Sequence, residues 1–344
     1  MTTSIVTFRN EFTERVLNFV WRQWCRMGVA GSSGRSDPWV IDPEPVLAFT
    51  TDVARHDARM FDEVMDWLDT NGRWINIQRL STVVRQDNVG DRAVLGAVAS
   101  WMAERDKSMK WRGLAQWTVA DVRKPEESLF RPGMGKTISG SEHADAHFQR
   151  YGLVRDTVRT RGMSQSVNME DPVNIVFKSR AVFGIGIRAD VMAYMMTTEG
   201  AHPRDVARTL GYNHMRVQEM LVGLADAGIA FVRPVGRAKH YWIDRDKWRS
   251  VLMGDQTSTL RWVNWRALTR GLTAIWRETW AIDEARADEY IFSSKMRSAM
   301  QAARNDLLGS GMRFVIEDDK GYVAEAYLPV FLRDVANMLN VLLG

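Results

Sequence analysis

Apolar residues recur at helical spacing through the middle of the chain, where the pattern is clearest. Val206, Ala207 and Leu210 lie on one face of a short predicted helix. A second helix follows, and its buried face is predicted at Val217, Met220, Leu221 and Leu224. Gly211 supplies the left-handed residue that a short turn between helices needs. The pattern therefore predicts two helices joined by a tight turn.

Neighbouring residues favour the same elements. We expect Tyr212 to fill the turn with its ring, and Asn213 is a good N-cap for the helix that follows. Gly228 is suited to end that helix. An apolar-faced helix over residues 185–196 comes before the pair, so three helices are predicted in succession.

A basic β-hairpin is predicted over residues 230–243. After its turn, two sets of side chains alternate between the faces of the strand: Ala238, His240 and Trp242, then Lys239, Tyr241 and Ile243. The tip of the hairpin carries Arg233, Arg237 and Lys239, where a wing would touch phosphate. Helix, helix, tight turn, helix and basic hairpin is the order of a winged helix-turn-helix.

The run from Asp205 to Ile229 resembles the helix-turn-helix core of ArsR- and MarR-like winged-helix regulators, and the resemblance covers residues 183–243 only. It implies a DNA-binding transcriptional regulator that places its third helix in the major groove. By position, the candidate DNA contacts from that helix are Asn213, His214, Arg216 and Gln218. Arg237 and Lys239 are the corresponding candidates from the wing.

Three further arginines lie around the first helix of this unit. Arg180, Arg188 and Arg204 could clamp the DNA backbone, or could equally be solubilising surface residues. The stretch from Val173 to Arg180 that leads into this helix fits either a short strand or a helical lead-in.

Glu219 departs from the pattern of the family. A carboxylate at this place would repel phosphate, unless it accepts a hydrogen bond from the amino group of a cytosine. Many winged helices are protein-protein modules. The alternative function is therefore a protein-interaction module, antitoxin-like or an adaptor subunit, in which the winged helix is a scaffold.

The whole chain is predicted to be mainly α with short β-hairpins. We expect an N-terminal helical domain over 1–120, a linker or lid over 121–172, the winged helix over 173–250, and a C-terminal helical domain over 251–344. The last domain should contain a hairpin between Met312 and Tyr327. Residues 58–106 could form a second, degenerate winged helix with Arg79, Arg85 and Arg92 near its surface. Packing or dimerisation is the other role open to that segment.

Two short motifs in the 121–172 segment resemble functional sites without completing them. Gly133–Thr137 suggests a phosphate-binding loop, but Phe130 stands where that loop requires a glycine. Glu142–His147 has the spacing of two zinc ligands on a helix, but the third ligand and the general base of a metalloprotease are absent. Neither motif predicts a site.

Charge and composition add modest information. The chain has 344 residues and a net charge of +4. Between Pro172 and Ser250 there are 12 Lys and Arg and 7 Asp and Glu, which concentrates positive charge on the predicted winged helix. Cys25 is the only cysteine, so an intrachain disulfide and a Cys-rich zinc site are excluded.

No arrangement typical of a catalytic site is present, so we predict no enzyme activity, no cofactor and no metal. No apolar run suggests a membrane span or a signal peptide, and a cytoplasmic location follows by default. The expected partners are double-stranded DNA and a second copy of the chain in a homodimer, with a protein partner under the alternative.

Overall fold

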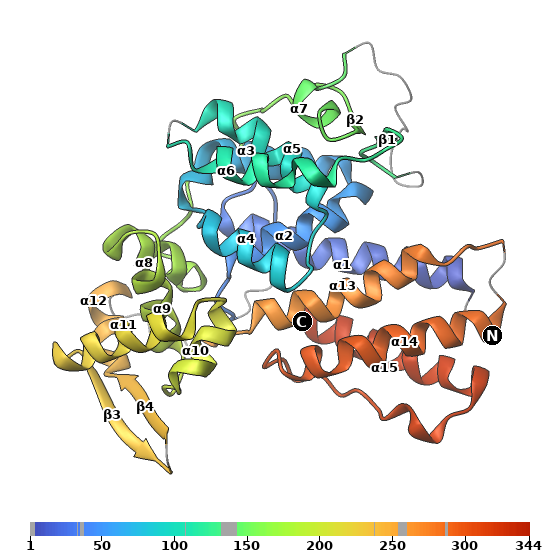
Figure 1. Cartoon of the computed structure of the whole chain (residues 1–344). Helices are drawn as coiled ribbons and strands as arrows, with labels where there is room; N and C mark the ends of the chain where they lie inside the picture. Colours follow the sequence, from blue (N-terminus) through green and yellow to red (C-terminus); the bar gives the residue numbers. More distant parts are fainter. Residues whose placement is uncertain are drawn as a thin grey trace.

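Helices form most of the structure, a computed structural model that describes residues 4–32, 34, 38–106, 108–131, 143–236, 238–253, 260–285 and 288–344. The strands within these residues form two small two-stranded sheets. The prediction of a mainly helical chain with short β elements is confirmed. Figure 1 shows three groups of elements, with the N-terminal helices above, residues 175–253 at the lower left, and the C-terminal helices at the lower right.

The described residues of the N-terminal group form seven α-helices and a small parallel sheet. Its elements are α1 (Ile5–Met27), α2 (Pro43–Val53), α3 (Ala58–Asn71), α4 (Ile77–Gln86), α5 (Arg92–Arg105), α6 (Lys110–Trp117), α7 (Ala146–Gln149), β1 (Glu127–Ser128) and β2 (Leu153–Val154), with short 3-10 turns at Ala54–His56, Gly72–Trp74 and Thr118–Asp121. Every residue of α5 from Ala93 to Met102 is buried. A helix without an exposed face cannot enter a groove of DNA. The element that follows α5 is the helix α6 and not a hairpin. The structure therefore does not favour a second winged helix over 58–106.

The first helix joins the two ends of the chain. Phe8 contacts Phe292 and Phe331 at ring-centroid distances of 5.7 and 5.4 Å, and these rings belong to the C-terminal helices. Further along α1, Trp24 packs edge-to-face on Trp67 of α3. Because one face of this helix is apolar over its full length, it is buried against both groups.

The described part of the 121–172 segment is packed, where the sequence favoured a linker or lid. Phe148, Tyr151 and Leu153 are buried, and the Tyr151 hydroxyl donates to the backbone oxygen of Ala115 at 2.6 Å. Asp66 accepts hydrogen bonds from the backbone of residues 162–164. A few aromatic residues and one buried carboxylate therefore hold a segment that is poor in aliphatic residues.

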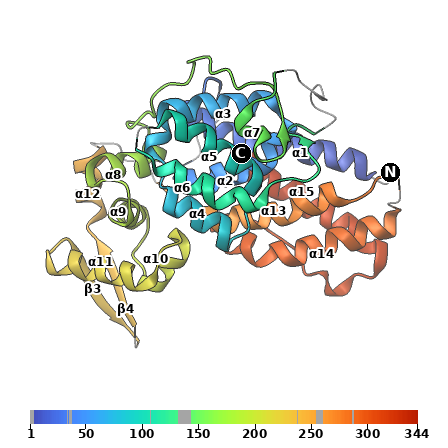
Figure 2. The same cartoon turned by 45° about the horizontal axis from the view of Figure 1, so that its top comes forward.

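The middle group contains the predicted winged-helix region. Its elements are α8 (Ile175–Phe183), α9 (Ile187–Thr197), α10 (Pro203–Leu210), α11 (His214–Asp226), β3 (Ala230–Val235), β4 (Ala238–Ile243) and α12 (Arg245–Met253), preceded by a 3-10 turn at Pro172–Asn174. The stretch from Val173 to Arg180 is therefore helical, and the alternative prediction of a short strand there was wrong. Figures 1 and 2 show that the β3–β4 hairpin extends away from the other two groups, with α11 running outward from its start near α10.

The C-terminal group consists of α13 (Trp265–Ala281), α14 (Glu289–Leu308) and α15 (Leu328–Leu343), with 3-10 turns at Asp319–Gly321 and Ala324–Tyr327. The hairpin expected between Met312 and Tyr327 was wrong, because no strand is present there. Phe314 and Ile316 are buried and Val315 is 76% exposed, so the alternation is real. Side chains of the neighbouring helices occupy the backbone groups that a second strand would need: Arg304 donates to Ile316 O, Arg297 donates to Tyr322 O, and Asp334 accepts from Glu317 N.

One contiguous cluster of buried apolar side chains runs through all three groups. Ala324–Leu343 is long and apolar enough to cross a membrane by length and composition, contrary to the expectation from sequence, and 50% of its most apolar window is buried. The buried helices of a protein core have the same composition. Since α15 packs on α1 and α14, the segment gives no membrane assignment.

Candidate nucleic-acid interface

The turn between α10 and α11 has the geometry that its sequence predicts. Gly211 adopts φ +76°, and its backbone N–H donates to Ala207 O at 2.8 Å, which ends α10. Asn213 is the N-cap of α11, and its side-chain oxygen accepts from Met215 N at 2.9 Å. Asn213 therefore has a structural role at the helix start, and its amide NH₂ group remains a possible donor to another partner, since the residue is exposed.

The solvent-facing side of α11 carries the predicted recognition residues. Val217 and Leu221 are fully buried, which fixes the rotation of the helix about its axis. Arg216, Gln218 and Glu219 are exposed in its first two turns, while His214 is half-buried. Arg216 and Gln218 are therefore both accessible, but residues two apart on a helix do not face each other, so they lie on either flank of the exposed side with Glu219 between them.

The hairpin pairs in an antiparallel register that fixes which way its basic residues point. Arg233 lies opposite His240, and Pro234 lies opposite Lys239. Because neighbouring residues of a strand point to opposite faces, Arg233 and Lys239 lie on different faces of the hairpin. The guanidinium of Arg233 lies 5.5 Å from the ring centroid of Trp242, and Lys239 is on the face of buried Tyr241. The predicted alternation along β4 is confirmed.

A third short segment anchors the hairpin. Ala201, between α9 and α10, exchanges backbone hydrogen bonds of 3.0 and 3.1 Å with Tyr241 of β4. Gly200 takes φ +92° beside this bridge, where a Cβ would come within 2.5 Å of Tyr241 O. The base of the hairpin is thereby fixed to the helices, and its tip extends beyond them.

The remaining candidates are exposed or lie outside the described residues. Arg204 is exposed in the first turn of α10, where its backbone N–H donates to His202 Nδ1 at 3.2 Å. Arg188 is exposed on α9. Arg237, at the turn of the hairpin, lies outside the described residues.

The outer surface of this unit is apolar as well as basic. Phe231, Val232 and Val235 of β3 are 48%, 40% and 46% exposed, and Met215 and Val222 of α11 are 53% and 39% exposed. Phe231 stacks on Trp242 with ring centroids 5.6 Å apart. Exposed apolar side chains in such number favour contact with another molecule.

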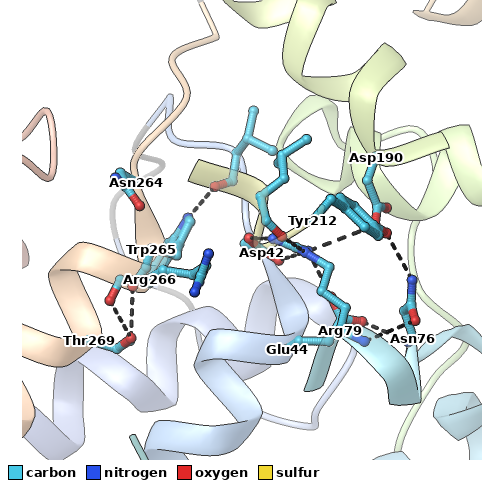
Figure 3. Close-up of polar contacts among 12 residues, drawn as sticks. Asp42, Glu44, Asn76, Arg79, Asp190, Tyr212, Asn264, Trp265, Arg266 and Thr269 are labelled. Atoms are coloured by element: carbon cyan, nitrogen blue, oxygen red, sulfur yellow. Dashed lines mark hydrogen bonds and ion pairs between the residues drawn. The ribbon is translucent and has the colours of Figure 1, made fainter. Parts of the chain in front are cut away.

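A buried network of charged groups docks this unit on the N-terminal helices (Figure 3). The Tyr212 hydroxyl donates to Asp190 Oδ2 at 2.5 Å and accepts from Asn76 Nδ2 at 3.0 Å. Burial and the Asp190 charge raise the pKa of Tyr212 well above its usual value. Beyond the expected filling of the turn by the ring, the Tyr212 hydroxyl joins the start of α4 to α9.

Two arginines at the centre of the network correct the predictions made for them. Arg180 is fully buried, donates to Glu44 at 2.7 and 2.8 Å and pairs with Asp190 at 2.9 Å, so it neither clamps DNA nor solubilises the surface. Arg79 is also buried, pairs with Asp42 and Glu44, and donates to Leu210 O at 2.6 Å. Both face carboxylates from a distant part of the chain, because a buried cation requires such a partner.

A second contact holds the same turn from the C-terminal side. Arg266 of α13 pairs with Asp87 and donates to Arg208 O at 2.7 Å, near the end of α10. Together with Arg79, it satisfies two carbonyl oxygens that the last turn of a helix leaves open. The direction of α11 relative to the body is therefore fixed by Arg79, Arg266 and Tyr212. One sequence signal could have indicated this buried network. Asp42 and Glu44 flank Pro43 at the start of α2, and two carboxylates so close together need cationic partners when they are buried.

The two short motifs of the 121–172 segment fall wholly or partly outside the described residues. Gly133–Thr137 and Glu142 lie outside the described residues. Asp145 caps α7 by accepting from His147 N at 3.0 Å, and His147 Nδ1 lies 3.0 Å from Ser100 Oγ. Within the described residues there is no group of three or more His, Cys, Asp and Glu side chains placed to hold a metal ion.

No family model, curated protein or solved structure matches this chain.

Proposed function

We propose that residues 183–243 form a winged helix-turn-helix and that the chain is a DNA-binding regulator that inserts α11 into the major groove. The observation that carries this proposal is the exposure of both Arg216 and Gln218 in the first two turns of a helix that is held to the body by buried Val217 and Leu221. Residues near the N-terminal end of a recognition helix are those that reach base edges. Arg favours guanine and Gln favours adenine in bidentate contacts.

The surrounding geometry supports the same function. The hairpin extends beyond the helices next to α11 (Figure 1), and the bridge at Ala201 fixes its base. Arg233, Lys239 and Arg204 are exposed, and each can reach phosphate. Arg180 and Asp190 neutralise each other in the interior, so the local excess of positive charge belongs to the surface.

The test is selection of a preferred sequence from a pool of random duplexes, followed by titrations against a scrambled duplex over a series of salt concentrations. The double variant Arg216→Ala/Gln218→Ala should lose the preference, because each bidentate contact contributes about 1–3 kcal/mol of discrimination. The matched control is Arg112→Ala/Gln116→Ala, an exposed Arg and Gln on α6. An unchanged preference in the first variant contradicts the proposal.

The wing is tested separately. Arg233→Ala and Lys239→Ala should weaken binding to the preferred and scrambled duplexes alike, and each should lower the salt slope by about 1. Loss of affinity in one variant and not the other would instead indicate a wing that lies flat on the DNA, because the two side chains lie on opposite faces of the hairpin. If both variants and the wild type have equal salt slopes, the wing does not contact the DNA.

Glu219 distinguishes two modes of binding. If its carboxylate only repels phosphate, Glu219→Gln should tighten binding to every duplex about twofold at low salt, the size of a screened charge contact across roughly 10 Å. If it reads a cytosine, the same variant should weaken binding to the preferred duplex alone.

A protein-interaction module is the second candidate function. The exposed Phe231, Val232 and Val235 favour it, because wings that contact only phosphate do not need apolar side chains. A protein that co-purifies with the chain, is lost from Val232→Ser/Val235→Ser and is not displaced by DNA would support this function. We also propose that the chain forms a homodimer. Size-exclusion chromatography with light scattering would measure its mass.

A further inference from the structure

A cavity of about 660 Å³ opens between the loop from α4 to α5, the start of α5, residues 120–123 and the end of α13. We propose that it binds a small, multiply charged anion that carries phosphate groups. This proposal does not depend on DNA binding. The volume lies within the roughly 300–1,000 Å³ of small-molecule sites, which is too small for a macromolecule.

Positive charge predominates in the lining of the cavity. Five arginines and three aspartates line it, an excess of two positive charges: Arg55, Arg92, Arg123, Arg131 and Arg277, with Asp52, Asp91 and Asp121. Each aspartate already faces an arginine. Asp91 pairs with Arg55 and Arg123 at 3.0 and 2.8 Å, Asp52 pairs with Arg277 at 2.9 Å, and Asp121 lies 3.8 Å from Arg92.

These carboxylates hold the arginines in place without using all of their donors. The side chains of Arg123 and Arg277 remain 44% and 37% exposed on the cavity. Arg55 is fully engaged, since it donates to Leu129 O, Asp91, Glu127 and Ser128 O. The site therefore has a fixed cationic wall behind accessible guanidinium groups, which is the arrangement that recognises phosphate.

Arg131 is the feature that the folded chain itself leaves unexplained. Within the described residues its guanidinium has no hydrogen bond or ion pair, although its backbone N–H donates to Arg55 O at 2.9 Å. Desolvation and repulsion from Arg55 lower the pKa of Arg131, against the attraction of Glu127, Asp91 and Asp52, and the residue remains exposed. A cation held beside another cation gains stability when an anion lies between them.

One wall of the cavity is apolar. Trp276 and Trp280 line it, and Trp280 lies against His56 with ring centroids 3.9 Å apart and carries the Arg9 guanidinium at 5.0 Å. Its faces are therefore engaged by other side chains, so we assign recognition to the charged groups and not to stacking of a base.

The experiment is calorimetric titration of the full chain with inorganic pyrophosphate in a buffer of low ionic strength that contains no phosphate. The wild type should bind. Arg131→Gln and Arg123→Gln should each weaken binding at least about tenfold, the size of a lost charge-assisted hydrogen bond. Arg188→Gln is the matched control, because Arg188 is an exposed arginine on α9 remote from the cavity, and it should bind like the wild type.

Other outcomes overturn the proposal. Absence of binding to the wild type at millimolar pyrophosphate would do so, as would equal weakening in Arg131→Gln and Arg188→Gln, which indicates attraction to overall charge. Citrate that binds as tightly as pyrophosphate would overturn the assignment to phosphate. Because Arg131 has no side-chain partner in the described residues, Arg131→Gln should melt at the wild-type temperature, and its result stands even if Arg123→Gln unfolds.

Discussion

The hydroxyl of Tyr212 lies 2.5 Å from the carboxylate of Asp190, and this contact ties the turn before α11 to the middle of α9. The two residues are 22 positions apart, and both are buried or half-buried. Arg180 and Arg79 hold the pKa of Asp190 below its usual value although burial by itself would raise it. Asp190 is therefore charged at neutral pH and accepts a hydrogen bond from the Tyr212 hydroxyl.

Replacing Tyr212 with phenylalanine tests the contribution of this contact. The change removes one donor to Asp190 and leaves Asn76 Nδ2 without its acceptor. Stability should fall by about 1–3 kcal/mol, because buried polar groups lose partners. Urea unfolding measures the loss. The control Tyr290→Phe, at a residue 56% exposed, should be unchanged, and equal stability of the two variants would contradict the role given to the hydroxyl.

Two nearby arginines should differ sharply on substitution. Arg180→Met removes one of the two cations that Glu44 and Asp190 face and leaves only Arg79 beside three buried carboxylates, so it should cost about 3–5 kcal/mol. Arg188→Met, at an exposed position eight residues later, should lie within about 0.5 kcal/mol of the wild type. Thermal melts of both variants give the comparison. A mild effect of Arg180→Met would mean that water or neighbouring donors reach the network.

Two glycines of the same unit should respond in opposite directions to alanine. Gly211 has φ +76°, and a Cβ there would lie 2.9 Å from Arg266 Nη1. Gly211→Ala should therefore destabilise the protein by about 1–2 kcal/mol. Gly223 is in the exposed interior of α11 with no atom within 4 Å of its added Cβ, so Gly223→Ala should stabilise by about 0.5–1 kcal/mol. Chemical unfolding of the two variants side by side checks both signs.

His56 should make the protein sensitive to acid. Burial and the charges of Arg131, Arg55 and Arg9 lower the pKa of His56 to about 3, while the unfolded chain has a value near 6.5. A lowered folded-state pKa means that the stabilising contribution is complete above about pH 6.5 and is lost progressively as the pH falls toward 3.

The comparison that isolates this residue is His56→Phe, which keeps an aromatic ring against Trp276 and Trp280. Between pH 7 and pH 5 the wild type should lose about 2 kcal/mol more stability than the variant, as linkage requires for these two pKa values. Other titrating groups are common to both proteins and cancel. Parallel curves of stability against pH would show that His56 is protonated in the folded protein.

Local patterns were the part of the fold that could be predicted. The spacing of Val217 and Leu221 predicted the buried face of α11, Gly211 predicted the turn before it, and Asn213 predicted its N-cap. These three features depend only on residues within a few positions of one another. The exposure of Arg216 and Gln218 follows from the same periodicity. The alternation of buried and exposed residues around Phe314 and Ile316 is real, but the hairpin predicted from it was wrong. A strand requires a partner strand, which the local sequence does not specify.

The burial of polar side chains could not be predicted from local patterns. Arg180, Arg188 and Arg204 have the same chemistry and lie around one helix, yet the first is buried and the other two are exposed. The partner of Arg180 is Glu44, 136 residues away. No spacing rule reports a contact across that distance.

The sequence by itself determined the helices, the turn at Gly211 and the hairpin over 230–243, because backbone conformation and amphipathic faces follow from neighbouring residues. Only the tertiary structure decided how the unit is docked, which arginines are buried, and that Arg123, Arg131 and Arg277 share one cavity. The physical reason is that a buried charge is stable only beside an opposite charge, and folding brings that charge from a distant part of the chain.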